Sequence, residues 1–313
     1  MASESTVNFG IYIPQLAFSY EDMLSRARTC ESLGYDSFWL FDHLYGPGLP
    51  KAPAFEAWTL ATALLSRTER LRVGHLVNCN NFRHPALLAR MATSLDVISG
   101  GRLEFGIGSG SYEREHHEAG LPWGPISERS ERLDEALQII TAMFAQPLTS
   151  FSGKHYTITD LPNLPAPVQQ PRPPIHIGGG GPKHTMPLVA RYADVWNVPT
   201  YALDRISELS AQLDAECDKI GRDPDEIARS VQAVLIVAPQ ASLDKAIEVG
   251  RRHYGGAAFG LDDGGFVGVP QQVTDRVGQL VDQGFTNFVF FVHDRGTTET
   301  LSLFADEVMS HFR

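Results

Sequence analysis

The clearest structural signal lies in residues 71–110, LRVGHLVNCNNFRHPALLARMATSLDVISGGRLEFGIGSG. An apolar stretch over Leu71–Val77 is typical of a buried strand, and a second one follows over Arg102–Ile107. Between them the spacing predicts a helix over Pro85–Ser99, because proline suits a first helical turn and the glycines at 100 and 101 end the helix. Two buried strands joined by a helix form a parallel βαβ unit.

The same alternation of short apolar stretches and longer helical ones runs along almost the whole chain. We expect eight strands, each followed by a helical stretch, which predicts a parallel sheet with helical crossovers. The number eight favours an α/β fold closed into a (β/α)8 TIM barrel, with a doubly wound open sheet as the alternative. One domain then spans residues 1–313. The expected strands are Val7–Ile13, Ser37–Phe41, Leu71–Val77, Arg102–Ile107, Pro174–Ile177, Asp194–Val198, Ser230–Val237 and Phe288–Val292. The expected helices include Tyr20–Leu33, Phe55–Ser66, Pro85–Ser99, a stripe over Leu133–Phe144, Lys183–Tyr192, Asp204–Ile220 and Thr297–Phe312.

Two connections are longer than ordinary loops. Ala145–Pro174 is rich in proline, and Gly255–Pro270 is rich in glycine. We interpret both as insertions in the βα loops that partly cover the mouth of the barrel.

Composition narrows the class of protein. The formal net charge is -11, which argues against a nucleic-acid partner, because phosphate backbones bind basic surfaces. We expect no membrane span, because no apolar run approaches the roughly 20 residues that a span needs, and no signal peptide is visible at the N-terminus. Cys30, Cys79 and Cys217 are scattered, which favours a reducing cytoplasm over a disulfide framework or a zinc site.

In barrels of this kind, function gathers at the carboxyl ends of the strands. Asp42 and His43 follow the second strand directly, and Asn78 follows the third. A histidine beside a carboxylate can be held in one tautomer and act as acid, base or hydrogen-bond donor. The alternative is a structural pair that caps the loop.

The four glycines Gly178–Gly181 follow the fifth strand and precede Pro182, which is placed to open a helix. Amide groups at a helix N-terminus form an anion site, and Lys183 adds positive charge, so this stretch predicts a phosphate cradle. The alternative is a sharp turn with tight packing. The order of residues does not match the P-loop of nucleotide hydrolases.

Two further groups of residues lie near the fourth strand. Gly106–Gly110 allows close approach of the backbone to a flat ring, although an ordinary βα turn explains it equally well. The acidic and histidine residues just after it are more typical of a solvated helix face than of a metal centre, and we predict no metal site; they are Glu113, Glu115, His116 and His117. His75, inside the third strand, is expected in the core, and Trp39 and Trp58 are expected to serve packing.

Taken together, these stretches resemble the bacterial-luciferase-like superfamily of flavin and deazaflavin oxidoreductases. Within it, the chain looks most like the branch that uses coenzyme F420, a deazaflavin, and the family fold is a (β/α)8 barrel. The resemblance runs nearly end to end and is carried by GYDSFWLFDH (residues 34–43), residues 82–110, residues 173–197 and residues 272–291.

The resemblance implies roles for individual residues. His43 would lie near the reactive C5 of the deazaflavin, with Asp42 orienting it or contacting the ring. A non-proline cis peptide of the family would fall at Leu76–Val77, behind the ring and next to Asn78. Remaining cofactor contacts would come from Gly108, Ser109, Gly178, Gly179, Gly180, Gly181 and Lys183.

One position departs from the related sugar-phosphate dehydrogenases. Those enzymes place a proton-transferring glutamate directly after the glycine-rich turn, where this chain has Ser111. Ser111 therefore argues against a sugar-phosphate substrate, with Glu113 as the nearest replacement acid. Both residues are candidates for substrate binding.

The sequence thus predicts an F420-dependent oxidoreductase that passes hydride to a small organic substrate, with reduction of an activated C=C or C=N bond favoured. The first alternative is an FMN-dependent monooxygenase on the same barrel. The second is a non-catalytic barrel that binds a flavin or a phosphate. The family likeness also implies a homodimer.

Overall fold

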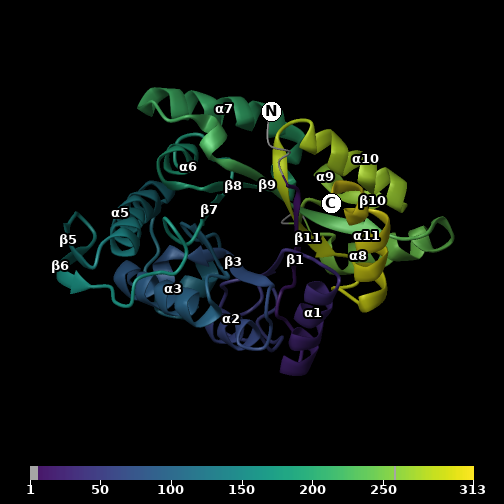
Figure 1. Cartoon of the computed structure of the whole chain (residues 1–313), viewed down its shortest axis with the longest axis horizontal. Helices are drawn as coiled ribbons and strands as arrows, with labels where there is room; N and C mark the ends of the chain where they lie inside the picture. Colours follow the sequence, from purple (N-terminus) through teal and green to yellow (C-terminus); the bar gives the residue numbers. More distant parts are fainter. Residues whose placement is uncertain (1–5, 257–258) are drawn as a thin grey trace.

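A computed structural model describes residues 6–256 and 259–313 of the chain and confirms the predicted (β/α)8 TIM barrel (Figure 1). Eight parallel strands pair in the order β1–β2–β3–β4–β7–β8–β9–β11, and β11 pairs back with β1, so the sheet closes. The barrel strands are β1 (Asn8–Tyr12), β2 (Ser37–Leu40), β3 (Arg72–Cys79), β4 (Leu103–Gly108), β7 (Ile175–Gly178), β8 (Val195–Pro199), β9 (Ala228–Val237) and β11 (Phe285–Val292).

Helices lie between the strands and cover the outside of the barrel. The α-helices are α1 (Tyr20–Ser32), α2 (Ala57–Leu65), α3 (Pro85–Ser99), α4 (Glu113–Glu118), α5 (Ile126–Ala145), α6 (Met186–Tyr192), α7 (Ile206–Ile220), α8 (Leu243–Tyr254), α9 (Leu261–Gly264), α10 (Pro270–Val281) and α11 (Thr298–Glu307). Short 3-10 helices are η1 (Asn80–Phe82), η2 (Thr200–Arg205), η3 (Pro224–Glu226), η4 (Gln240–Ser242) and η6 (Met309–Phe312).

Helix α3 has the bounds that its sequence predicts, because its end signals are local. The His84 side chain accepts a hydrogen bond from the amide of Ala86, and Pro85 occupies the first turn. Gly100 ends the helix in the left-handed conformation, with φ at 67°. In the part of the chain that the structure describes, none of the helices combines the length and the apolar character needed to cross a membrane.

The helix after β7 begins later than predicted. It starts at Met186 instead of Lys183, and residues 182–185 form a turn in which the amides of Thr185 and Met186 bind the carbonyl of Gly181. The physical reason is Pro187, whose ring would clash with the carbonyl four residues earlier if the helix began at Lys183. The glycine run is therefore separated from the helix by this turn, and the expected helix N-terminus at the glycines was wrong.

The first long connection does not cover the barrel mouth, so this expectation was wrong. It forms an antiparallel hairpin of β5 (Leu148–Ser152) and β6 (Thr157–Pro162), which lies outside α5 in Figure 1. The Glu135 carboxylate on α5 accepts hydrogen bonds from three amides of the hairpin turn, residues 154–156. The Asp96 carboxylate on α3 binds the chain further on, at Val168 and Gln169. Buried and half-buried acceptors on the outer helices thus hold the segment there.

The second long connection does approach the mouth. It contains α9 and the short strand β10 (Phe266–Gly268), which adds to β9 outside the barrel. Phe259, within this connection, reaches the cavity at the mouth.

Trp39 fills the centre of the barrel, as its expected packing role requires. Its indole nitrogen donates to the hydroxyl of Ser37 over 2.8 Å. A Cβ at Gly10 would lie 2.7 Å from this nitrogen, and a Cβ at Gly74 would lie 2.8 Å from the ring. The indole thus occupies the space left by two glycines and closes the barrel below the cavity described next.

Candidate functional site

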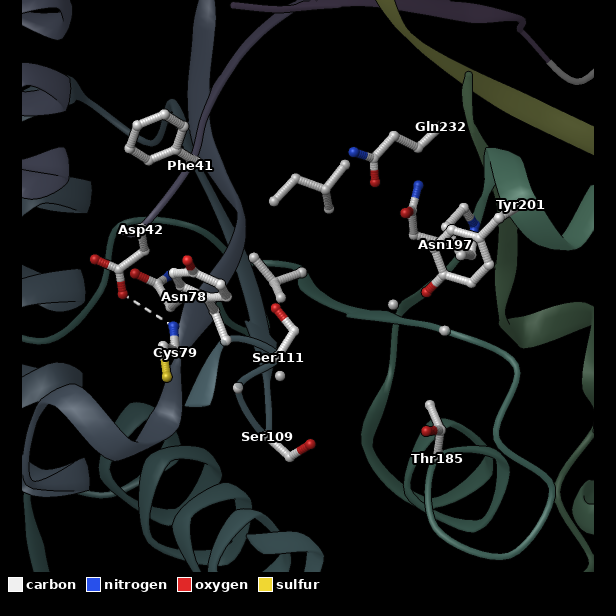
Figure 2. Close-up of a pocket in the computed structure, with 18 of the residues that line it drawn as sticks. Phe41, Asp42, Asn78, Cys79, Ser109, Ser111, Thr185, Asn197, Tyr201 and Gln232 are labelled. Atoms are coloured by element: carbon white, nitrogen blue, oxygen red, sulfur yellow. Dashed lines mark hydrogen bonds between the residues drawn. The ribbon is translucent and has the colours of Figure 1, made fainter. Parts of the chain in front are cut away.

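A cavity of about 510 Å³ opens at the carboxyl ends of the barrel strands (Figure 2). Most residues expected at a functional site line it, although they come from distant parts of the sequence. Those that do are Asp42, His43, Leu76, Val77, Asn78, Gly108, Ser109, Ser111, Gly178, Gly179, Gly180 and Gly181. Lys183 and Glu113 do not line it: both are exposed, on the turn after β7 and at the start of α4. In Figure 2, Asp42, Asn78 and Cys79 lie across the cavity from Asn197, Tyr201 and Gln232.

Strand β3 bulges toward the cavity where it carries the predicted cis peptide. The Leu76–Val77 bond is cis, and the pairing with β4 shifts register between His75 and Asn78. The side chain of Val77 then occupies space on β4, because a Cβ at Gly108 would lie 2.8 Å from Val77 Cγ2. The bulge therefore requires glycine at position 108, because a side chain there would clash with Val77.

Asn78 fixes the bulge through its side-chain amide. The oxygen of this amide accepts from the indole of Trp58 over 2.8 Å, and the nitrogen donates to the carbonyl of Gly106 over 2.7 Å. Both polar atoms are thus committed within the protein, so Asn78 shapes the cavity wall at that point.

Asp42 is buried beside Arg83 and does not bind His43. Its carboxylate accepts two hydrogen bonds from the Arg83 guanidinium, at 2.7 and 2.9 Å, and one from the amide of Cys79 at 2.9 Å. The side chain of Asp42 is 4% exposed. The resemblance implied that Asp42 orients His43, whereas in the structure the carboxylate instead ties the end of β2 to the end of β3.

Replacing Arg83 with methionine should destabilise the fold strongly. The Asp42 carboxylate would stay buried without its cation, a change that costs about 3–5 kcal/mol in comparable buried pairs. Urea denaturation measures the free energy of unfolding. The matched control is Arg252→Met, because Arg252 pairs with Glu248 on the exposed face of α8 and should change stability little. Equal stabilities of the two variants would contradict the prediction.

His43 is held by Glu115, a residue that sequence reasoning placed on a solvated face. His43 Nδ1 lies 2.8 Å from Glu115 Oε2, and the Glu115 side chain is fully buried. The other carboxylate oxygen accepts from the amides of Leu44 and Tyr45. Because Nδ1 faces a carboxylate, it carries a hydrogen, and Nε2 is left for a ligand. Within residues 6–256 and 259–313, no hydrogen bond engages Nε2.

His116 is also buried, so the prediction of a solvated face was wrong for both residues. His116 Nδ1 lies 3.0 Å from the carbonyl of Tyr112, and its Nε2 lies 3.4 Å from the sulfur of Cys79. Burial raises the pKa of the Cys79 thiol to about 12, so the thiol stays protonated and donates to the imidazole. Glu113 and His117 are exposed, as expected.

No periodic signal in the sequence marks this burial. Glu115 and His116 are neighbours about 100° apart around a helix, and Ala119, one turn further on, is exposed. No group of three or more His, Cys, Asp or Glu side chains among the described residues is arranged to hold a metal ion.

The glycine run forms one side of the cavity. Gly179 has φ of 114° and is anchored at both ends, because its amide donates to the carbonyl of Asn197 and its carbonyl accepts from the indole of Trp196. The next two amides, of Gly180 and Gly181, bind no acceptor within the described chain. A Cβ at Gly180 would lie 2.8 Å from Leu209, so a side chain would not fit there.

Two polar side chains next to the glycines were not expected. Thr185 and Arg205 line the cavity, whereas Lys183 does not. Thr185 lies close to the run, because a Cβ at Gly181 would be 3.0 Å from its hydroxyl oxygen. Free amides, a hydroxyl group and a guanidinium are the donors that a phosphate group accepts. Thr185 could have been found from the sequence as the first hydroxyl side chain after the glycines, whereas Arg205 comes from a different βα connection.

The chain resembles proteins of one family in both sequence and fold. The family described as luciferase-like monooxygenase matches residues 5–260. An F420-dependent glucose-6-phosphate dehydrogenase of Microbacterium testaceum is 27% identical over 338 residues, covering 98% of each chain. An FMNH(2)-dependent dimethylsulfone monooxygenase of Pseudomonas putida is 27% identical over 271 residues, covering 75% of this chain and 74% of its own.

Among solved structures, an F420-dependent secondary alcohol dehydrogenase in complex with an F420-acetone adduct superposes with a TM-score of 0.85. It is 19% identical, and the match covers 98% of this chain and 99% of that one. This structural likeness supports the same barrel fold. Since the family match extends over far more than half of the sequence, the chain belongs to the luciferase-like monooxygenase family.

Proposed function

We propose that the chain is an F420-dependent oxidoreductase that reduces an activated C=C or C=N bond of a small organic substrate. The observation that carries this proposal is a cavity with one apolar side that suits the ring of the cofactor and another side of free amides that suits its phosphate. On one side Leu76 and Val77 of the β3 bulge line the cavity with apolar side chains, and on the other the amides of Gly180 and Gly181 bind no acceptor among the described residues. The F420-dependent relative supports the choice of cofactor.

The residues present suit a phosphorylated tricyclic ring. F420, when bound, supplies a carbon centre, C5, that gives or takes a hydride. Val77 would support the ring, and Gly180, Gly181 and Thr185 would donate hydrogen bonds to the phosphate on its side chain. The free Nε2 of His43 would hold or deliver the proton that the substrate needs, because Glu115 fixes the orientation of the imidazole.

Cofactor titrations test the proposal. Purified protein should bind F420 with a dissociation constant at least about tenfold lower than that for FMN, measured by fluorescence, and should oxidise reduced F420 when an unsaturated carbonyl is added. Tighter FMN binding with oxygen consumption would instead support the monooxygenase alternative, for which the Pseudomonas relative gives a precedent. Binding of F420 without turnover on any acceptor would support a non-catalytic barrel.

Replacing Glu115 with glutamine should lower kcat by about tenfold without changing cofactor affinity. The glutamine amide keeps the shape of the side chain but removes the charge that orients His43, so His43 would sample unproductive orientations. Steady-state kinetics and a cofactor titration on the same preparation measure both effects. Glu118→Gln, on the exposed side of the same helix, is the control and should leave kcat unchanged. A kcat equal to that of the control would contradict this role for Glu115.

We also propose that residues 1–313 act as one domain within a homodimer, as the resemblance implies. The three cysteines are buried and unpaired, which supports a cytoplasmic location. Light scattering of the purified chain tests the dimer.

A further inference from the structure

The cavity has two unlike halves. The half formed by β3, β4 and β7 carries glycines and free amides, which suit the cofactor. The rest of the lining includes aromatic side chains from β1 and β11, from the residue after β2 and from the connection before α9. We call these four residues the aromatic wall: Tyr12, Phe41, Phe259 and Phe291.

Much of the aromatic wall is preassembled by edge-to-face contacts. The ring centroids of Tyr12 and Phe291 are 4.3 Å apart at an angle of 70°, and those of Phe259 and Phe291 are 5.4 Å apart at 85°. Tyr254 packs behind the wall, with centroid distances of 5.0 Å to Phe259 and 5.6 Å to Phe291. Such packing holds these rings in place before a ligand arrives.

Charge argues against an anionic substrate on this side. Among the described residues, Arg205 is the Lys or Arg side chain that lines the cavity. It pairs with Glu208 and stands one helical turn before Leu209, which packs on Gly180. It therefore belongs to the glycine half. Asp42 and Glu115 also line the cavity, and each is already paired, Asp42 with Arg83 and Glu115 with His43, so these partners are not free to bind a second phosphate.

The wall contains one hydrogen-bond donor without a partner. Among the described residues, the Tyr12 hydroxyl makes no hydrogen bond, although the side chain is buried. Burial raises the pKa of Tyr12, and so do Tyr254 and Asp42 to a smaller extent. The phenol therefore stays neutral and can donate to a carbonyl oxygen.

We propose that the substrate is a neutral α,β-unsaturated ketone bearing an aromatic or similarly flat apolar group, which packs against the aromatic wall while its carbonyl oxygen accepts a hydrogen bond from Tyr12. This inference rests on the proposed function and names its substrate class. We expect a sugar phosphate not to bind against the wall, because the wall itself carries one hydroxyl group, that of Tyr12, and no cationic side chain.

The reaction balances as a two-electron reduction. The β-carbon of the ketone accepts a hydride, the C=C π bond opens, and the α-carbon takes a proton from His43, which solvent reprotonates. The substrate gains two hydrogen atoms, one as the hydride that reduced F420 would supply and one as the proton from His43, and the proton that F420 would release on oxidation would pass to solvent. Tyr12 stabilises the negative charge that develops on the carbonyl oxygen.

Calorimetry on the protein saturated with oxidised F420 separates binding from turnover. The probes are 4-phenyl-3-buten-2-one, the smaller methyl vinyl ketone, and glucose 6-phosphate. We expect the phenyl ketone to bind at least about tenfold more tightly than methyl vinyl ketone, because the phenyl group adds buried apolar area. Glucose 6-phosphate should not bind. Binding of glucose 6-phosphate as tight as that of the phenyl ketone would overturn the proposal.

Three variants, one of them a control, test whether the effect comes from the wall. Phe291→Leu should reduce the preference for the phenyl ketone about fivefold or more, because an edge of the wall is lost. Phe290→Leu is the matched control: this neighbour in β11 is fully buried and packs against Phe266 and Phe304, away from the cavity. Equal preferences in the two variants would overturn the assignment. Tyr12→Phe should weaken both ketones about tenfold, and unchanged binding would remove the role of its hydroxyl.

The proposed substrate class and the proposed cofactor can each be wrong without the other being wrong. If the protein binds FMN and not F420, the proposed cofactor is wrong, but the preference for the phenyl ketone can still be measured on the FMN complex. If F420 binds and the preference is absent, only the substrate class is wrong.

Discussion

Replacing His43 with alanine should lower kcat by a factor of about 10² to 10⁴ while the dissociation constant of the cofactor stays within about twofold. The imidazole is one-quarter exposed at the cavity, and its Nδ1 atom is bound by Glu115, so only Nε2 is free to meet the substrate. Removing the ring removes the proton donor. The bulge of β3 and the amides of the glycine run, which we propose hold the cofactor, stay in place.

Three measurements on one preparation test this expectation: turnover of reduced F420 with an unsaturated ketone, a cofactor titration, and urea denaturation. His117→Ala is the matched control, because this histidine lies on the exposed face of α4 and should leave turnover unchanged. Turnover within about threefold of the wild-type value would show that His43 has no chemical role. A joint loss of turnover and of cofactor affinity would mean that His43 acts by shaping the cavity.

How much of the structure the sequence predicts depends on how close together in the chain the deciding residues lie. The bounds of α3 could be predicted because the residues that begin and end it, His84, Pro85 and Gly100, lie in or directly next to the helix in the sequence. The eight strands could be predicted because a strand buried on both faces reads as a near-continuous apolar run. The cis bond at Leu76–Val77 was predicted through the family resemblance, since no local residue type demands it.

Pairings between distant side chains were beyond such reasoning. Glu115 reaches His43 across 72 positions of sequence, and its burial depends on how α4 packs under the loop after β2. The partner expected for His43, Asp42, is adjacent in sequence but points to Arg83 instead. The path of residues 145–174 was mispredicted for the same reason, because Glu135 and Asp96 on the outer helices bind its backbone.

Replacing Gly179 with alanine should weaken F420 binding by about 10- to 100-fold. The φ angle of 114° is one that side-chain-bearing residues rarely adopt, and holding alanine there costs about 1–3 kcal/mol. The backbone can relieve this cost by rotating. The amide and the carbonyl of Gly179 oppose such a rotation, because they are hydrogen-bonded to Asn197 and Trp196. Rotation would turn the free amides of Gly180 and Gly181 away from the phosphate, and each 1.4 kcal/mol lost is tenfold in affinity.

A matched glycine and a trimmed ligand separate this effect from general destabilisation. Gly221→Ala makes the same substitution at a left-handed glycine that ends α7, where a new Cβ meets no atom within 4 Å. It should lower stability about as much as Gly179→Ala and leave F420 affinity unchanged. The deazaflavin riboside, which lacks the phosphate, should bind wild type and Gly179→Ala alike, because Val77, which would support the ring, is unchanged. If the riboside loses as much affinity as F420, the glycine run does not hold the phosphate, and the phosphate cradle must be sought elsewhere in the cavity.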